Sequence, residues 1–213
     1  MICGVDEAGK GSVLGPMVIA AVGISDEDVF SDLTIRDSKT HSAKERERLA
    51  VIIRERCRVT TVKIDAHEID AIRAEMTLNA CVARAHAQVI SRLRPKTAYV
   101  DACDVNEFRY AEMVRYHLTR QCEIVSEHHA DSTFPIVSAA SIIAKVTRDK
   151  EILKLTKKYG EIGSGYPADP ITIAWLSSYL DDHRHPPPIA RKSWKTVITM
   201  IGKKEQSSLE RFF

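Results

Sequence analysis

The sequence predicts an α/β fold in which helices flank a mixed central sheet. Two apolar runs come first, separated by a glycine-rich turn, and further β-rich runs then alternate with helical segments. The helical segments after the last strand predict a small C-terminal helical lobe. The chain has 213 residues, enough for one large domain or for one domain with an appendage.

The expected strands are short and rich in apolar or β-branched residues. The runs 2–6 and 16–24 form a pair, and the second run is apolar enough to lie inside the sheet. The segment 59–64 alternates as a half-buried strand does. Two further strands are predicted over 97–102 and 122–128.

The expected helices are marked by capping residues, glycine and proline. Ser42 with Glu45 predicts the start of a helix that runs to about Arg58. The longest helix covers 135–159; it is opened by Ser132 or Thr133 and ends near Gly160. The other predicted helices cover 76–93, 106–120, 171–182 and 193–201.

The composition is that of an ordinary globular protein, with 44% hydrophobic and 28% charged residues. No apolar run approaches the ~20 residues of a membrane span. The first strand begins so early that we expect no signal peptide. The five cysteines form no C-x-x-C pair, which predicts reduced thiols and a cytoplasmic location.

The net charge of +2 does not by itself indicate a nucleic-acid-binding protein. The segment from His183 to Lys204, however, contains no acid and six of its residues are basic. They are Arg184, Arg191, Lys192, Lys195, Lys203 and Lys204. The segment is therefore either a solvated basic helix end or a lobe that faces phosphates.

Acidic residues lie at the C-terminal ends of three predicted strands: Asp6-Glu7, Asp101, and Asp131 just past the third. Ligands of open α/β sheets bind at this edge. Converging carboxylates repel one another and raise each other's pKa, unless a hard cation such as Mg²⁺ lies between them. Two ions about 3.5–4 Å apart would suit phosphodiester cleavage. Taken singly, each acid could also be a cap or a surface residue.

Asp6 and Glu7 present a difficulty, because adjacent residues of a regular strand point to opposite faces. The strand must bend at Glu7, or Glu7 must contribute differently, for example through its main-chain carbonyl. His128-His129 suggests a metal site, but adjacent histidines diverge on a strand, so we treat them as secondary.

Four stretches together resemble ribonuclease HII in its archaeal form: "GVDEAGKGSVLGP", "YVDA", "HHADSTFPIVSAASIIAKVTRD" and "GSGYPADP". The resemblance covers nearly the whole chain. It implies a ribonuclease-H-like fold in which Asp6, Glu7, Asp101 and Asp131 bind Mg²⁺ or Mn²⁺ and are catalytic. It also implies a monomeric enzyme that does not bind membranes.

The implied activity is hydrolysis of the RNA strand of RNA–DNA hybrids and incision 5′ of ribonucleotides embedded in duplex DNA. A metal-bound water attacks, a second ion stabilises the leaving 3′-oxygen, and the products carry 5′-phosphate and 3′-hydroxyl ends. The implied role is removal of ribonucleotides and primers in DNA replication and repair. The competing hypotheses are a DNA nuclease or resolvase with a similar acid cluster, and a non-catalytic binding module.

The resemblance also assigns substrate contacts. Main-chain amides of Gly9, Lys10 and Gly11 are expected to contact the 2′-hydroxyl, and Tyr166 is expected to stack beyond the ribonucleotide. Lys10 replaces the usual Arg, so a bidentate contact would be lost. The change should be mild if main-chain amides make the contact. Without the resemblance, the glycines indicate a tight turn and Tyr166 a surface aromatic.

The long helix carries Ser138, Ser141, Lys145 and Arg148 at spacings of three, four and three, which predicts one polar face. Its opposite side offers Ile136, Ala140, Ile143 and Ala144 to the core. Lys145 and Arg148 could hold phosphates, and Arg148 could equally pair with an acid. Lys39 in "RDSK" matches a family motif near the substrate.

The C-terminal residues match a short motif that binds the sliding clamp (PCNA). Leu209, Phe212 and Phe213 would lie on one side of a helical turn, with Gln206 preceding them. The alternative is a tail folded back on its own protein. We therefore predict a catalytic domain over 1–165, a substrate-binding helical lobe over 166–205 and a flexible clamp-binding tail over 206–213.

Overall fold

The computed structural model describes residues 1–33, 35 and 41–209. They divide into two compact units. The sheet unit comprises Met1–Ala8, Val18–Lys63 and Met76–Thr147. The helical unit comprises Gly9–Met17, Ile64–Glu75 and the chain from Arg148 onward. Both units are discontinuous in sequence, which differs from the predicted boundaries at 165 and 205.

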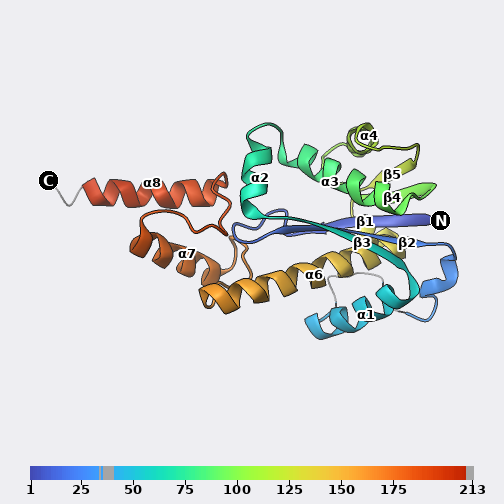
Figure 1. Cartoon of the computed structure of the whole chain (residues 1–213), viewed down its shortest axis with the longest axis horizontal. Helices are drawn as coiled ribbons and strands as arrows, with labels where there is room; N and C mark the ends of the chain where they lie inside the picture. Colours follow the sequence, from blue (N-terminus) through green and yellow to red (C-terminus); the bar gives the residue numbers. More distant parts are fainter. Residues whose placement is uncertain (34, 36–40, 210–213) are drawn as a thin grey trace. The chain divides into compact units, whose positions relative to one another are not determined.

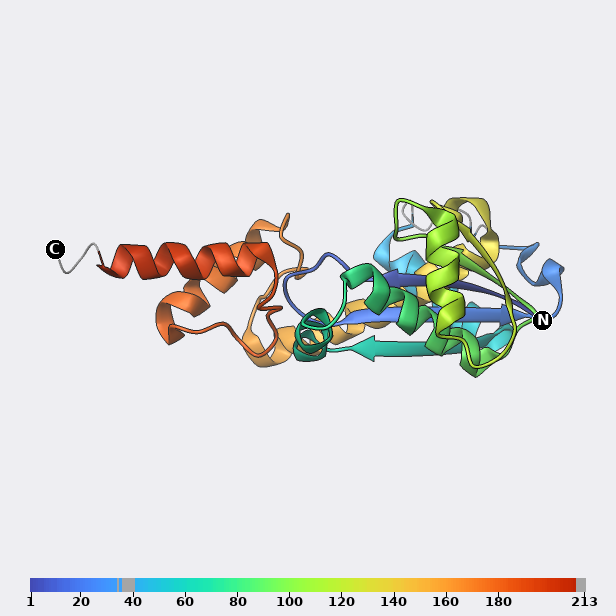
Figure 2. The ribbon, with the colours of Figure 1, turned by 90° about the horizontal axis from the view of Figure 1, so that it is seen from above.

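The sheet has five strands in the order β3-β2-β1-β4-β5. They are β1 (Ile2–Ala8), β2 (Met17–Ile24), β3 (Arg58–Ile64), β4 (Thr97–Asp101) and β5 (Glu123–Glu127). β1 pairs antiparallel with β2, as the two blue arrows in Figure 2 show. β1 also pairs parallel with β4, which in turn pairs parallel with β5. The predicted mixed sheet is confirmed.

β1 extends past the two acids that were expected to end it. Its pairing with β2 continues regularly through Asp6↔Ala20, Glu7↔Ile19 and Ala8↔Val18. The prediction that the strand ends at Asp6 was wrong, because the antiparallel partner supplies hydrogen bonds as far as Ala8. Both acids therefore lie inside a regular strand.

Helices cover both faces of this sheet (Figure 1). α1 (Ala43–Arg56) and the first half of α6 (Pro135–Tyr159) pack on one face, where they form a core with β1 and β2. α3 (Leu78–Leu93) and α4 (Glu107–Tyr116) cover the other. α6 packs so closely that a Cβ at Gly4 would lie 2.3 Å from the carbonyl oxygen of Ile136. Gly4 is therefore required by the packing of helix on strand.

The helix starts are only partly as predicted. Ser42 caps α1, because its hydroxyl accepts a hydrogen bond from the Glu45 amide. Ser132 and Thr133 do not open α6; they belong to a separate short helix, α5 (Ala130–Thr133). Phe134 is extended and divides the two helices, so α6 starts directly at Pro135.

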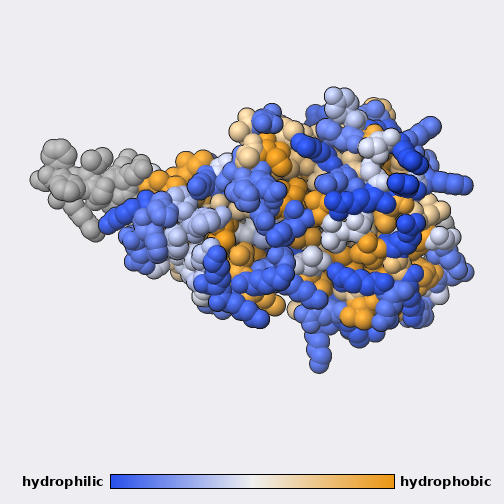
Figure 3. Space-filling model, in the orientation of Figure 1, coloured by the Kyte–Doolittle hydropathy of each residue, from blue (hydrophilic) through white to orange (hydrophobic). Residues whose placement is uncertain are grey.

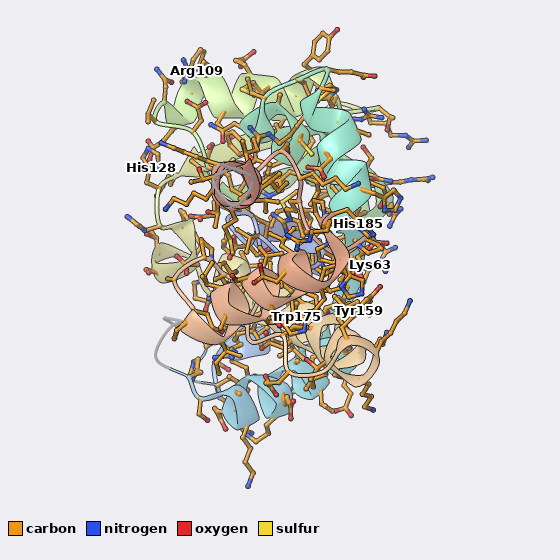
Figure 4. All side chains as sticks on the ribbon, turned by 90° about the vertical axis from the view of Figure 1, so that its left-hand side faces the viewer. Lys63, Arg109, His128, Tyr159, Trp175 and His185 are labelled. Carbon is orange, nitrogen blue, oxygen red and sulfur yellow. The ribbon has the colours of Figure 1, made fainter. Side chains whose placement is uncertain are left out.

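The helical unit contains α2 (Ala66–Arg73), α7 (Pro170–His183), α8 (Lys195–Leu209) and the end of α6. Val13, Leu14, Ile162, Leu176 and Val197 are among its core residues. Aromatic residues extend this core, and the indole N–H of Trp175 donates to the Tyr159 carbonyl (3.1 Å; both labelled in Figure 4). α2 was not predicted, although Asp65 and Glu68 form a capping box at its start.

The last helix is longer than predicted, because α8 extends to Leu209 and not to residue 201. The main chain of Gln206 and Leu209 is therefore helical, which differs from the predicted flexible tail from 206 onward. The side chains of these two residues lie outside the described part, as do Phe212, Phe213 and Lys39.

The surface is mainly polar. Hydrophobic residues form separate patches between hydrophilic ones on the face shown in Figure 3. Within the described ranges, no helix has the length and apolar character needed to cross a bilayer. All five cysteines are free thiols; Cys3, Cys81 and Cys122 are buried. 

Candidate active site

The predicted acids lie at one edge of the sheet. Asp6 and Glu7 lie in β1, Asp101 is the last residue of β4, and Asp131 lies in α5 just after β5. Because β1, β4 and β5 are parallel neighbours, their carboxyl ends meet at the same edge. The sequence correctly predicted this shared placement.

Asp6 and Asp101 lie close enough to neighbouring acids for those charges to raise their pKa values. Burial raises the pKa of Asp6 well above its ordinary value, and the charges of Glu7 and Asp101 raise it further. Hydrogen bonds from the Ser141 hydroxyl and from the Glu7 amide (2.7 Å) oppose this rise.

The pKa of Asp101 is raised by burial first, then by the charges of Glu7 and Asp131. The amide of Ala130 opposes this rise by donating to Asp101 Oδ1 at 2.8 Å. Asp101 thus repels acids from both β1 and α5. The arrangement is a carboxylate cluster held in place by main-chain donors.

Glu7 points to the opposite face from Asp6, as the alternation of a strand requires. Asp6 contacts Ser141 of α6, whereas Glu7 Oε2 lies 3.1 Å from Nε2 of His86 in α3. β1 stays regular at this point, so of the two alternatives for Glu7 the bend is absent and a different contribution remains. The Glu7 side chain nevertheless acts electrostatically on both Asp6 and Asp101.

His86 and Tyr110 were not singled out from the sequence. His86 is fully buried between Glu7 and the hydroxyl of Tyr110, which lies 3.0 Å from His86 Nδ1. In the tautomer of His86 whose Nε2 carries the proton, Nε2 donates to the Glu7 carboxylate and Nδ1 accepts from the Tyr110 hydroxyl. The available signal was a polar residue at helical spacing from buried Val82 and Ile90.

The donor set fits a hard divalent cation. Asp6 and Asp101 present carboxylate oxygens at this edge. Burial and, after it, the charges of neighbouring acids raise their pKa values, and a cation would relieve the repulsion between these charges. Over the described part of the chain, no three His, Cys, Asp or Glu residues are arranged as a metal-binding group. One or two carboxylates, completed by phosphate oxygens and water, are how Mg²⁺ is usually held.

His128 and His129 lie apart from this network. Both are exposed, and His128 Nε2 lies 4.0 Å from Glu107 Oε1 (His128 is labelled in Figure 4). Their secondary rank in the sequence interpretation agrees with this placement.

A second group of predicted site residues lies within the helical unit. Gly9 to Ser12 form a turn, in which the Ser12 amide and hydroxyl both donate to the Gly9 carbonyl. The Gly9 amide donates to the Tyr166 hydroxyl at 3.0 Å. Gly9 has a φ of +85°, which favours glycine. Gly9 and Tyr166 are therefore brought together, with Gly11 exposed on the same turn.

The predicted polar face of α6 is largely buried, and the residues predicted for its core side, Ile136, Ala140, Ile143 and Ala144, are buried as expected. Ser138 and Ser141 are buried, because their hydroxyls bond the Ile35 carbonyl and Asp6 respectively. Arg148 is also buried; it donates to the carbonyls of Pro16 and Ser164. Lys145 is half-buried.

Arg148 also stacks on the predicted sensor. Its guanidinium carbon lies 4.6 Å from the centroid of the Tyr166 ring. Arg148 was expected either to bind phosphate or to pair with an acid. The contacts described here are of neither kind. They support the loop that carries Tyr166.

The basic residues of the segment 183–204 differ in their exposure. Arg184, Lys192, Lys195 and Lys203 are exposed, as both sequence interpretations required. Arg191 is instead fully buried. It was expected on the surface, but its guanidinium contacts carbonyls of the glycine-rich loop.

Comparison with known proteins gives consistent matches. The family model described as ribonuclease HII matches residues 3–197. The chain is 70% identical to a ribonuclease HII of Methanoregula boonei, over 100% of both chains. The solved PCNA:RNase HII complex from Archaeoglobus fulgidus is 42% identical with a TM-score of 0.87, covering 94% of this chain and 96% of that chain. Ribonuclease H2 from Pyrococcus horikoshii is 37% identical with a TM-score of 0.89, covering 96% and 99%. These matches confirm the predicted fold class.

We predict that Asp6→Asn stabilises the protein at neutral pH in EDTA. A folded-state pKa above the unfolded value means that the folded state binds more protons, so stability falls as pH rises from about 4 through the raised pKa. Neutralising the site should add about 1 kcal/mol, a Tm increase of about 2–4 °C for a chain of this size.

Thermal denaturation between pH 4.5 and 8 measures this effect, and the gain should shrink as pH is lowered. Asp32→Asn is the matched control, because Arg56 holds the pKa of that exposed carboxyl below its ordinary value. Asp32→Asn should not raise the Tm at pH 7.5. Equal Tm values for Asp6→Asn and the parent at pH 8 would contradict the prediction.

Proposed function

Because the chain belongs to the ribonuclease HII family, we propose that it hydrolyses the RNA strand of RNA–DNA hybrids and incises duplex DNA 5′ of an embedded ribonucleotide. The products would carry 5′-phosphate and 3′-hydroxyl ends. The observation that carries this proposal is the carboxylate cluster, in which burial and then the charges of Glu7 and Asp101 raise the pKa of Asp6.

Asp6, Glu7, Asp101 and Asp131 would hold Mg²⁺ or Mn²⁺, two ions when substrate is bound. The ions would activate water and stabilise charge on the leaving oxygen. The chain orients the ligands: the Glu7 amide and Ser141 hold Asp6, and the Ala130 amide holds Asp101. His86 holds Glu7 from the other face of the sheet.

We further propose that the turn at Gly9, Lys10 and Gly11 contacts the ribose 2′-hydroxyl, with Tyr166 against the neighbouring nucleotide. The bond from the Gly9 amide to the Tyr166 phenol supports this role, because a ribose hydroxyl is the same kind of acceptor. The effect of Lys in place of the usual Arg at position 10 should be mild, because the contact described for this residue involves its main chain: the Lys10 carbonyl accepts from Arg191.

The sequence analysis assigns phosphate contacts to Lys145 and Arg148, of which only Lys145 has an accessible side chain. Lys39, placed near the substrate by the resemblance, lies outside the described residues. We propose that the exposed lysines of the segment 183–203 add phosphate contacts in the helical unit. Arg148 we reassign to support of the Tyr166 loop.

The C-terminal residues Gln206, Leu209, Phe212 and Phe213 are proposed to bind a sliding clamp. The relative from Archaeoglobus fulgidus was solved as a complex with PCNA, which supports this assignment. The enzyme would then act as a monomer in ribonucleotide and primer removal during DNA replication and repair. The free cysteines are consistent with action in the cytoplasm.

Asp101→Asn tests the proposed activity directly. We expect cleavage of a duplex with one ribonucleotide in Mg²⁺ to fall by about 10²–10³-fold, because the cluster loses a charged oxygen ligand. Asp182→Asn is the control; this carboxylate is exposed on α7 and should leave the rate unchanged.

The same assay separates the alternative functions. All-DNA, all-RNA, hybrid and single-ribonucleotide duplexes are compared. Cleavage of all-DNA duplex would favour a DNA nuclease, and binding without cleavage in Mg²⁺ or Mn²⁺ would favour a binding module. Equal rates for the parent and Asp101→Asn would remove Asp101 from the mechanism.

Gly11→Ala tests the sugar contact without disturbing the free protein. No described atom lies within 4 Å of a Cβ at Gly11, and its φ is not in the left-handed region. We therefore expect an unchanged Tm and an at least tenfold loss of single-ribonucleotide cleavage, because the new methyl group would face the sugar. Gly202→Ala, equally unhindered in α8, is the control. Wild-type cleavage by Gly11→Ala would argue against a close approach of the sugar.

Deleting residues 206–213 tests the clamp contact. Surface plasmon resonance with an archaeal sliding clamp should show loss of binding, while hydrolysis of short duplexes should persist. Phe212→Ala/Phe213→Ala should reproduce the binding loss without shortening α8. Loss of hydrolysis in the deletion variant would instead support a tail folded back on the protein.

A further inference from the structure

Arg191 is a cation buried to 0% exposure in the helical unit. Burial of a guanidinium is unfavourable unless its N–H groups are bonded. Its position therefore reflects specific partners, and these partners lie in one loop.

The guanidinium donates to three carbonyl groups of the loop Gly9–Gly15. Nη2 lies 2.6 Å from the Gly9 oxygen, Nη1 lies 2.8 Å from the Lys10 oxygen, and both Nε (3.3 Å) and Nη2 (3.2 Å) reach the Gly15 oxygen. A planar fork with fixed donor directions can hold three carbonyls at once, whereas an ammonium group would reach fewer of them. Arg191 thus ties the two ends of this loop together.

These contacts set the direction of the loop's amides. In a trans peptide the C=O and the following N–H point in opposite directions. The Gly9 carbonyl shares its peptide plane with the Lys10 amide, and the Lys10 carbonyl shares its plane with the Gly11 amide. Because both carbonyls point toward buried Arg191, the amides of Lys10 and Gly11 point away from it.

Arg191 is itself held from several sides within the helical unit. Its amide donates to the Val13 carbonyl at 2.9 Å, and its guanidinium carbon lies 4.8 Å from the Trp194 ring centroid. Asp70 of α2 accepts hydrogen bonds from the amides of Lys192 (2.7 Å) and Ser193 (3.0 Å). The segment that carries Arg191 is therefore fixed to α2 independently of its contacts with the loop Gly9–Gly15.

We propose that Arg191 is a positioning residue for ribonucleotide discrimination: by binding the carbonyls of Gly9, Lys10 and Gly15, it directs the Lys10 and Gly11 amides toward the sugar hydroxyl. Arg191 does not touch the substrate. This inference rests on the proposed role of the loop in reading the 2′-hydroxyl.

The test compares binding of two duplexes of equal sequence, one with a single ribonucleotide and one entirely of DNA. Fluorescence anisotropy in EDTA gives both dissociation constants, and their ratio is the discrimination of each variant. Arg191→Gln should reduce this ratio by about tenfold or more, since hydrogen bonds to a charged group are lost. Arg191→Lys should recover part of the ratio, because the charge remains without the fork.

Two further variants separate positioning from loss of stability. Leu176→Ala removes a fully buried side chain from the same core, so it should lower the Tm without changing the ratio. Trp194→Leu retains the guanidinium but removes the ring beside it; it should lower the ratio less than Arg191→Gln. If Arg191→Gln does not fold, the discrimination ratios of Arg191→Lys and Trp194→Leu test the positioning role of Arg191 instead.

Gly11→Ala distinguishes failure of the inference from failure of its premise. If Gly11→Ala keeps the parent ratio, the loop does not read the sugar and the proposed function of the loop fails. If Gly11→Ala lowers the ratio while folded Arg191→Gln and Trp194→Leu keep it, the loop's role stands and the inference about Arg191 is overturned.

Discussion

Repulsion between carboxylates at one edge of the sheet is the constraint on which the site depends. Parallel pairing of β1, β4 and β5 forces Asp6, Asp101 and the start of α5 to the same edge, and burial then raises the pKa of Asp6 and Asp101. Main-chain amides of Glu7 and Ala130 offset part of this penalty. The remainder is stability that the fold gives up for a binding site, which is the usual relation between active sites and stability.

The alternation of β1 explains why both covering layers take part in the site. Asp6 faces α6 and receives the Ser141 hydroxyl, whereas Glu7 faces α3 and contacts His86. A helix that only covered the sheet could be apolar on its inner face. Each of these helices instead carries one buried polar residue opposite an acid, and His86 is fixed in turn by Tyr110 of α4. Asp6 and Glu7 are therefore oriented from two sides of one strand.

The sequence predicted what depends on local pattern and missed what depends on contacts across the chain. Strand runs, the Ser42 cap and the acids at the ends of β4 and β5 follow from neighbouring residues, so they were predicted. α2 was missed because its eight residues give too short a periodic signal. Arg191 was expected on the surface because it lies in a basic run, yet its partner Lys10 is 181 positions away. Neither spacing nor composition encodes such a contact.

In the glycine-rich loop, glycines that look alike in sequence differ in their contacts. A Cβ at Gly9 would lie 2.3 Å from Nε of Arg148, and the residue has positive φ, so the folded protein itself requires glycine there. Gly11 has no such requirement among the described atoms, although it lies on the same turn. Two buried arginines, Arg148 and Arg191, bind the carbonyls around this turn; apolar side chains in their place would leave those oxygens unsatisfied. The arginines that fix the loop thus explain why residue 9 is glycine. At residue 11 the described atoms impose no such requirement, so the close approach of a substrate is the remaining reason for glycine there.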